Sequence, residues 1–276
     1  MSEQPASVGV SPTKDPQPPE QAGGAAEVLG SILEKLSFRN ISALYIFAVI
    51  FIVFSIWVPE TFLAESTWRS LIDSQAITAL VAVGLVLAVS AGAFNLAVGT
   101  EVGLGAILVS WLLVNQEMSI VPALILTILA GGVVGLFSGL MITVARIDSF
   151  IATLGVSSIL LAAISWVSGD QQILNLSRSF QKLGTNEFLI FTWPVWIMIG
   201  VAIVVWYLLE RTPAGRHIYA TGNNVEAARL AGVKTKRVIV GSLIGCGMIV
   251  ALGGLLVTST VGAGDPTVGP PYLLPA

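Results

Sequence analysis

Residues Ile120–Ala145 read IVPALILTILAGGVVGLFSGLMITVA and contain no charged side chain. A helix needs about 20 predominantly apolar residues to cross the hydrocarbon core of a bilayer, so this stretch is long enough to span it. The whole chain agrees, since 55% of its 276 residues are hydrophobic and only 11% are charged. That charged fraction is about half of what soluble domains carry. The stretch therefore predicts an integral membrane protein.

Six more apolar stretches lie on either side of the first one. They are Ile41–Val58, Ile77–Gly92, Val98–Val114, Phe150–Val167, Trp193–Leu209 and Val238–Thr258. Together with Ile120–Ala145 they predict an all-α membrane protein, a polytopic bundle of about seven transmembrane helices. Gly92–Thr100 interrupts an otherwise continuous apolar run, and either a turn between two helices or a broken helix would explain the interruption.

The remaining composition excludes several classes of function. A net charge of −3 and a pI near 5.2 give no basic surface for nucleic acid. Cys246 is the single cysteine and His217 the single histidine, so neither a disulfide framework nor a cluster of Cys or His metal ligands can form within the chain. The sequence also lacks the G-x-x-x-x-G-K-[ST] loop that holds ATP phosphates. We therefore expect no enzyme activity, cofactor or metal site.

The N-terminal residues 1–35 are rich in Pro, Gln, Glu and Ala, which predicts a disordered cytoplasmic tail ahead of a permease domain over residues 36–276. Basic residues set the orientation, because short cytoplasmic loops retain Lys and Arg. With a cytoplasmic N-terminus and seven passes, ten of the 13 basic residues lie inside and three, Arg69, Arg178 and Lys182, lie outside. This bias predicts a multi-pass membrane protein with a cytoplasmic N-terminus.

Glycines recur every fourth residue in two of the predicted spans. Gly131, Gly135 and Gly139 form one strip, and Gly241 with Gly245 begins another. Small residues at this spacing let helix backbones approach closely. We expect close packing along both strips, with the lining of a translocation path as the alternative.

The predicted cytoplasmic loop 210–237 has the signals of a short folded helix. Asn224 can cap a helix start, Glu226 suits the positive first turn, and Gly232 can end the helix in the left-handed conformation. A helix this short is marginal in water without a partner. We expect it to dock on a cytoplasmic protein, or alternatively to lie on anionic lipid.

Several motifs in this order resemble the ribose/xylose/arabinose group of permeases from ATP-binding-cassette (ABC) importers. In the loop they are Thr212–Arg216 (TPAGR), Tyr219–Asn224 (YATGNN) and Glu226–Val233 (EAARLAGV). Before it, Ala91–Thr100 (AGAFNLAVGT) and Phe150–Gly155 (FIATLG) are similar to two further family segments. The stretch from Gly262 to Tyr272 resembles the family's Gly-Pro-Gly-Tyr segment.

The resemblance implies a pore subunit that translocates a monosaccharide or related small polar solute. Its partners would be cytoplasmic ABC ATPase subunits, an extracytoplasmic sugar-binding protein, a second permease copy and membrane lipid. The implied ATPase-coupling residues are Gly215, Arg216, Gly222, Asn223, Asn224, Glu226, Ala227, Ala228, Arg229 and Gly232. The residues implied at the translocation path or helix break are Gly92, Asn95, Gly99, Phe150 and Thr153.

The chain departs from the family pattern in two places. Asn95 and Ala97 stand where the family commonly has Asp and Ser, which leaves an amide either to hold the interrupted backbone or to face a sugar path. The family also continues for about three more spans after Tyr272, so we expect a fragment, a truncated version of the larger permease fold. We expect the nearby Glu101 at the membrane interface, because a carboxylate in the bilayer costs several kcal/mol.

The main alternative function is an ion-coupled secondary transporter. In such proteins broken helices hold the substrate and the ion near the middle of the membrane, and residues 92–100 could be one such break. The sequence offers no second copy of the break and few acidic residues at membrane depth to couple protons. These observations favour the ATP-driven importer.

Overall fold

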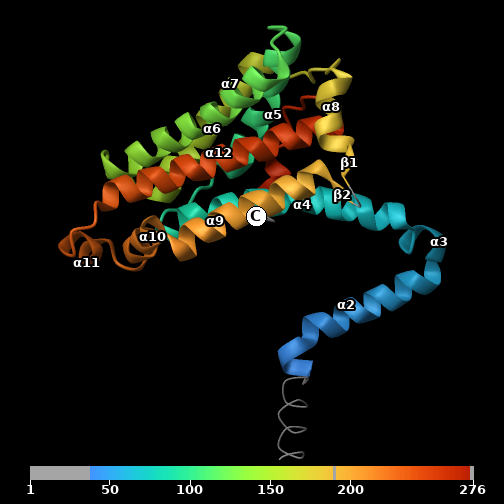
Figure 1. Cartoon of the computed structure of the whole chain (residues 1–276), viewed down its shortest axis with the longest axis horizontal. Coiled ribbons are helices and arrows are strands. Elements are labelled where there is room, and N and C mark those ends of the chain that lie inside the picture. The colour runs from blue at the N-terminus through green and yellow to red at the C-terminus, as the bar shows by residue number, and fades with distance from the viewer. Residues whose placement is uncertain (1–37, 189–190, 274–276) are drawn as a thin grey trace, which may run out of the picture. The chain divides into compact units, whose positions relative to one another are not determined.

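The computed structural model describes residues 38–188 and 191–273. They divide into two units, the first ending at Ala64 and the second beginning at Glu65. The predicted tail, residues 1–35, lies outside the described residues. The first unit contains α2 (Phe38–Trp57) and α3 (Pro59–Phe62) (Figure 1). Phe62 lies 5.3 Å from the ring of Phe51 and 5.8 Å from that of Phe54. From Tyr45 onward α2 exposes apolar side chains on nearly every face, as a helix in lipid does.

The second unit is a bundle of helices with one two-stranded hairpin. Its elements are α4 (Glu65–Ser90), α5 (Val98–Val114), α6 (Ile120–Thr143), α7 (Ser149–Ser168), α8 (Arg178–Thr185), β1 (Glu187–Phe188), β2 (Phe191–Thr192), α9 (Trp193–Arg211), α10 (Pro213–Asn223), α11 (Val225–Leu230), α12 (Thr235–Val261) and the 3-10 helix η1 (Pro270–Tyr272). The hairpin pairs Glu187 with Thr192. The all-α membrane fold predicted from the sequence is confirmed.

Each of the seven predicted spans corresponds to a helix. Five helices are long and apolar enough to cross a membrane, namely α4, α6, α7, α9 and α12, while α5 and the described part of α2 are shorter apolar helices. The largest boundary error is in α4, which begins at Glu65 and not near Ile77. Its polar first turns continue the helix and carry an ion pair between Arg69 and Glu65 at 2.6 Å.

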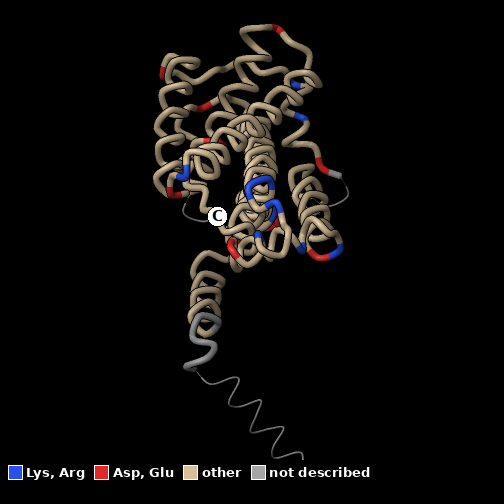
Figure 2. The backbone as a smooth tube through the Cα atoms, turned by 90° about the vertical axis from the view of Figure 1, so that its left-hand side faces the viewer, with Lys and Arg blue, Asp and Glu red and all other residues tan. Residues whose placement is uncertain are grey.

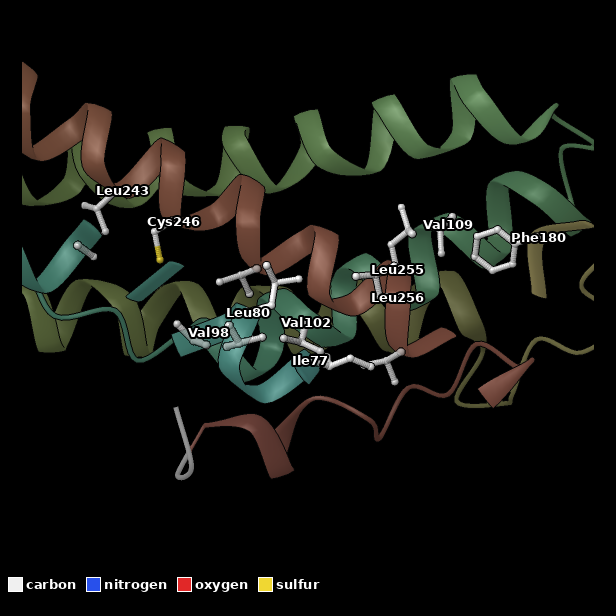
Figure 3. Packing of buried hydrophobic residues seen from close by; sticks show 14 of the residues in the cluster. Ile77, Leu80, Val98, Val102, Val109, Phe180, Leu243, Cys246, Leu255 and Leu256 are labelled. Atoms are coloured by element: carbon white, nitrogen blue, oxygen red, sulfur yellow. The ribbon is translucent and has the colours of Figure 1, made fainter. Parts of the chain in front are cut away.

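Helix α12 lies at the centre of this unit and packs against α4, α5, α6 and α8. Its buried residues include Cys246, Val250 and Leu255, which join Leu80 of α4 and Val102 of α5 in the main apolar core (Figure 3). The side chains of Val250 and Leu80 are fully buried. Because α12 is covered on several sides, its packing fixes where the other helices lie.

The glycine strip of α6 faces the backbone of α12. A Cβ at Gly135 would lie 2.6 Å from the carbonyl carbon of Leu243, and one at Gly139 would lie 2.9 Å from the Cα of Val240. The prediction of close packing is confirmed for this strip, so these glycines do not line a path. It is wrong for Gly241, where an added Cβ would meet nothing within 4 Å. The glycine of α12 that touches α6 is Gly247, because Gly241 lies on another face of the helix.

The second unit has two distinct ends. Helices α10 and α11 lie at one end, and α8 lies with the hairpin at the other (Figure 1). At the hairpin end Arg69 pairs with Glu187 at 3.0 Å, and the hydroxyl of Thr192 donates to Asp73 at 2.6 Å. The turns at the α10–α11 end, which faces the viewer in Figure 2, carry most of the basic residues. They are Arg146, Arg211, Arg216, Arg229, Lys234, Lys236 and Arg237.

Candidate functional site: an exposed loop joined to a buried helix break

The segment Thr212–Arg216, which the sequence suggested only as a motif, begins helix α10. The hydroxyl of Thr212 donates to the carbonyl of Leu208 at 2.5 Å and accepts from the amide of Gly215 at 3.3 Å. Pro213 suits the first helical turn, where its missing N–H costs nothing. Gly215 is buried against the backbone of Leu209. A Cβ at Gly215 would lie only 2.5 Å from the carbonyl carbon of Leu209, so no larger residue fits there. The loop therefore folds tightly onto the end of α9.

Helix α11 has the caps that the sequence predicted. The side chain of Asn224 accepts from the amide of Ala227 at 2.9 Å, and Gly232 adopts a left-handed φ of 85° after the helix. Glu226 and Arg229 form an ion pair, and both side chains are about two-thirds exposed. The short helix predicted here is confirmed, and its charged pair points outward.

The outer surface of α11 is partly apolar. Leu230 is 80% exposed and Val225 is 45% exposed, whereas Ala228 is buried against the loop. The helix therefore leaves apolar surface exposed beside its charged pair. Arg216 and Asn223 are also exposed at this end of the unit.

The loop contacts the end of α4 through glycine. A Cβ at Gly222 in α10 would lie 3.0 Å from the carbonyl carbon of Ser90 and 3.2 Å from the amide nitrogen of Gly92. Gly92 itself has a φ of 81°, a conformation that favours glycine. Backbone thus touches backbone where α4 stops. The sequence singled out both glycines, but it gave no signal that they meet.

The interruption after α4 is an irregular segment over residues 91–97 that leads into α5. The Asn95 side chain holds it from both sides: its oxygen accepts from the amide of Ala97 at 3.0 Å, and its nitrogen donates to Glu101 at 3.1 and 3.3 Å. The amide of Leu96 donates to the hydroxyl of Thr153 at 3.1 Å. These bonds satisfy backbone groups that the interruption frees, as apolar surroundings require. Asn95 therefore holds the interrupted backbone, one of the two roles that the sequence left open.

The expectation for Glu101 is wrong. We expected this residue at the membrane interface, but its side chain is 1% exposed inside the bundle. The break brings the first turn of α5 among the other helices, so the carboxylate faces Asn95 and not water. The Asn95 amide also lies 3.6 Å from the sulfur of Cys246 on α12. No local pattern predicts this three-residue cluster, because its members come from two distant segments.

The other predicted path residues surround the same break. The rings of Phe94 and Phe150 stack with centroids 4.7 Å apart, and both side chains are nearly half exposed. Gly99 meets the returning C-terminal segment, since a Cβ there would lie 3.0 Å from the carbonyl oxygen of Gly269. The structure thus gathers Gly92, Asn95, Gly99, Phe150 and Thr153 around one irregular segment.

Comparison with known proteins places the chain in a family. The family model described as "Branched-chain amino acid transport system / permease component" matches residues 69–276. The ribose import permease protein of Haemophilus influenzae is 32% identical over 84% of this chain and 73% of its own length. The L-arabinose ABC transporter permease protein of Azospirillum brasilense is 28% identical over 94% of this chain and 76% of its own.

A third relative, the ribose import permease protein of Bacillus subtilis, is 33% identical over 83% of this chain and 71% of its own length. No solved structure matches the chain. These relatives favour the ABC importer over the ion-coupled transporter. The matched region, the membrane helices and the relatives agree, and the chain belongs to the family of ABC importer permeases that includes the ribose and arabinose permeases.

Proposed function

We propose that this permease passes a monosaccharide or a related small polar solute across the bacterial inner membrane, driven by ATP hydrolysis on separate ABC ATPase subunits. An extracytoplasmic sugar-binding protein would deliver the solute, and a second permease copy would complete the pore. The functions for which the relatives are named, import of ribose and transport of L-arabinose, support this substrate class. The family description as one component of a transport system supports the separate partners.

In this proposal the α10–α11 end faces the cytoplasm, and so does the N-terminus. Of the ten basic residues in the second unit, seven lie at the α10–α11 end. Only Arg69, Arg178 and Lys182 lie toward the hairpin end. Lys and Arg concentrate in cytoplasmic loops of membrane proteins, so the distribution supports this orientation.

The observation that carries the proposal is the surface of α11. A capped helix that exposes Leu230, Val225 and the Glu226–Arg229 pair has an apolar contact ringed by charge. Such a helix gains stability when a partner covers it, because one of six residues is marginal alone. We assign α11 and the loop around it, residues 210–237, to ATPase docking.

Contacts behind α11 would carry the ATPase's motion into the membrane. Helix α10 touches the end of α4 through Gly222 and Ser90, and the segment that follows leads to Asn95. A backbone contact contains no flexible side chain to absorb movement. A shift of α10 should therefore displace the break at residues 91–97.

We assign the solute path to the surroundings of that break. A cavity of about 400 Å³ lies beside it, lined by Phe94, Asn95 and Leu96, among others. Its volume falls within the range of small-molecule sites. The aromatic ring of Phe94 in the cavity wall offers a surface on which a sugar ring could pack.

A charge swap at α11 tests the docking role. Glu226→Arg combined with Arg229→Glu keeps the pair within the helix but reverses the charges shown to a partner. The reversal opposes the helix dipole, which costs about 0.3–1 kcal/mol. We expect the doubly swapped permease to reach the membrane but to lose co-purification with ABC ATPase subunits from the same genome. Unchanged co-purification and uptake would reject the docking assignment.

A second variant separates docking from coupling. Gly222→Ala pushes a methyl group into the backbone at Ser90 but leaves the surface of α11 intact. We expect it to retain the ATPase and lose uptake, while Gly200→Ala, whose Cβ meets nothing within 4 Å, retains both. Uptake of labelled ribose and of labelled leucine, with the corresponding binding proteins, tests the substrate class. Preference for leucine would reject the sugar assignment.

A further inference from the structure

A cavity of about 530 Å³ opens where α4, α9, α10 and α12 meet. Its inner wall is apolar and includes Leu87, Leu208, Ile218 and Val238. The cavity lies behind α11, apart from the exposed face of Leu230 and from the break at Asn95. The cavity shares lining residues with the loop 210–237, among them His217, Lys234 and Arg237, but none of the α11 side chains proposed for docking lines it, and neither does the break at Asn95.

Two cationic side chains, Lys234 and Arg237, lie in the wall of this cavity. His217 also lines it, and none of its lining residues is acidic. Within the part of the chain that the structure describes, Arg69 and Arg229 have carboxylate partners, but the side chains of Lys234 and Arg237 have neither an ion pair nor a hydrogen bond. Two unpaired cations beside an apolar wall match a ligand that combines an anion with a hydrocarbon chain.

Small residues of α12 keep the cavity open. A Cβ at Gly241 would meet nothing within 4 Å. The next residue, Ser242, also lines the cavity, and its side chain is 4% exposed with no hydrogen-bond partner for its hydroxyl among the described residues. Buried hydroxyls are normally hydrogen-bonded, so an unpartnered one at a cavity wall points to an occupant.

The depth of the cations suits a lipid headgroup. The spanning helix α12 starts at Thr235, so Lys234 directly precedes its first turn and Arg237 lies within that turn. The ends of spanning helices lie near the level where lipid headgroups meet the hydrocarbon core. Basic pockets between membrane helices bind the headgroups of anionic lipids. We propose that this cavity is a binding site for one anionic phospholipid, with its phosphate on Lys234 and Arg237 and an acyl chain along Leu87 and Val238. This site does not depend on the ATPase-docking role.

Native mass spectrometry of the purified full chain in neutral detergent tests the site. We expect one phosphatidylglycerol to be retained in preference to phosphatidylcholine with the same acyl chains, and not to be displaced by inorganic phosphate. Lys234→Gln and Arg237→Gln should each weaken retention about fivefold. Lys236→Gln is the matched control, because it removes the same charge from the same turn but does not line the cavity.

A space-filling variant tests the hydrocarbon part. Gly241→Leu should abolish retention of phosphatidylglycerol, whereas Gly200→Leu on α9 should leave it unchanged. Gel filtration and thermal unfolding establish that both variants fold. Three results would overturn the proposal: equal loss in Lys236→Gln, full retention in Gly241→Leu, or displacement by inorganic phosphate. Loss of an ATPase partner in Gly241→Leu with lipid retained would assign the cavity to that protein and also reject the lipid.

Discussion

Replacing Gly135 by alanine should destabilise the permease, whereas the same replacement at Gly200 should not. Both residues lie in apolar helices, so both variants gain the same intrinsic preference of alanine over glycine, about 1 kcal/mol. They differ in what the new methyl group meets. At Gly135 it would lie 2.6 Å from the carbonyl carbon of Leu243, and at Gly200 nothing lies within 4 Å.

The difference between the two variants therefore isolates the steric cost at the contact between α6 and α12. Inserting a methyl group into a packed interior typically costs about 1–3 kcal/mol. Here the obstacle is backbone, which cannot rotate away, so the helices must separate and the contacts on either side of Gly135 loosen too. For a chain of this size, each kcal/mol of lost stability usually lowers the midpoint temperature of unfolding by about 2–4 °C. We expect Gly135→Ala to unfold on the order of 5 °C below Gly200→Ala.

Thermal unfolding in detergent, followed through the fluorescence of the seven tryptophans, measures this difference. Membrane proteins often unfold irreversibly, so both variants must be heated at one scan rate. Gly155→Ala, where the added Cβ also meets nothing within 4 Å, provides a second control. If Gly135→Ala and Gly200→Ala unfold at the same temperature, the glycine strip does not set the distance between α6 and α12.

Three other changes test two parts of the site and the turn that follows α12. Asn95→Leu removes the donor to the buried carboxylate of Glu101 and should lower the free energy of unfolding by about 1–3 kcal/mol. In chemical denaturation, the double variant with Glu101→Leu should recover part of that lost stability. If the losses from the two single substitutions simply add, the two residues are not paired. Asn224→Ala removes the cap of α11 at a cost of about 1 kcal/mol, so hydrogen exchange should quicken over residues 225–230 and stay unchanged elsewhere. Hydrogen bonds from the Thr267 side chain and backbone hold the pKa of Asp265 below its usual value. Ionised Asp265 thus stabilises its turn when the pH is above about 3.9, the pKa of an unfolded Asp. This stabilisation is lost as the pH falls through the lower pKa of the folded state. Thr267→Val should move that loss to higher pH, as hydrogen exchange over residues 262–268 would record.

Local patterns were enough to predict the seven apolar helices and the caps of α11. A spanning helix can be predicted because crossing the bilayer requires about 20 predominantly apolar residues, whatever the helix packs against. The caps of α11 are visible because Asn224 and Gly232 act on their own neighbouring backbone. The start of α4 was missed, since hydropathy marks only the apolar part of a helix and the turns before Ile77 are polar.

Two other missed features depend on how the chain packs. Helix α10 was hidden because Pro213 and Gly215 usually interrupt helices, although here one begins the helix and the other permits contact with Leu209. The burial of Glu101 follows from where the break places the start of α5. Residue spacing predicts neither arrangement, because the packing of the whole bundle determines which residues Gly215 and Glu101 contact.

Two sets of glycines in this permease serve different purposes, although both bring backbone against backbone. Those of α6 lie along the contact between α6 and α12, with further contacts on either side, which suits a fixed joint. Gly222 lies at the edge of the bundle, between an exposed loop and the end of α4, and Gly92 follows the contact directly. In the proposed function this contact transmits displacement, because the loop on one side would move with the ATPase and the segment on the other lacks helical hydrogen bonds. A methyl group at Gly135 should therefore change stability, and one at Gly222 should change coupling.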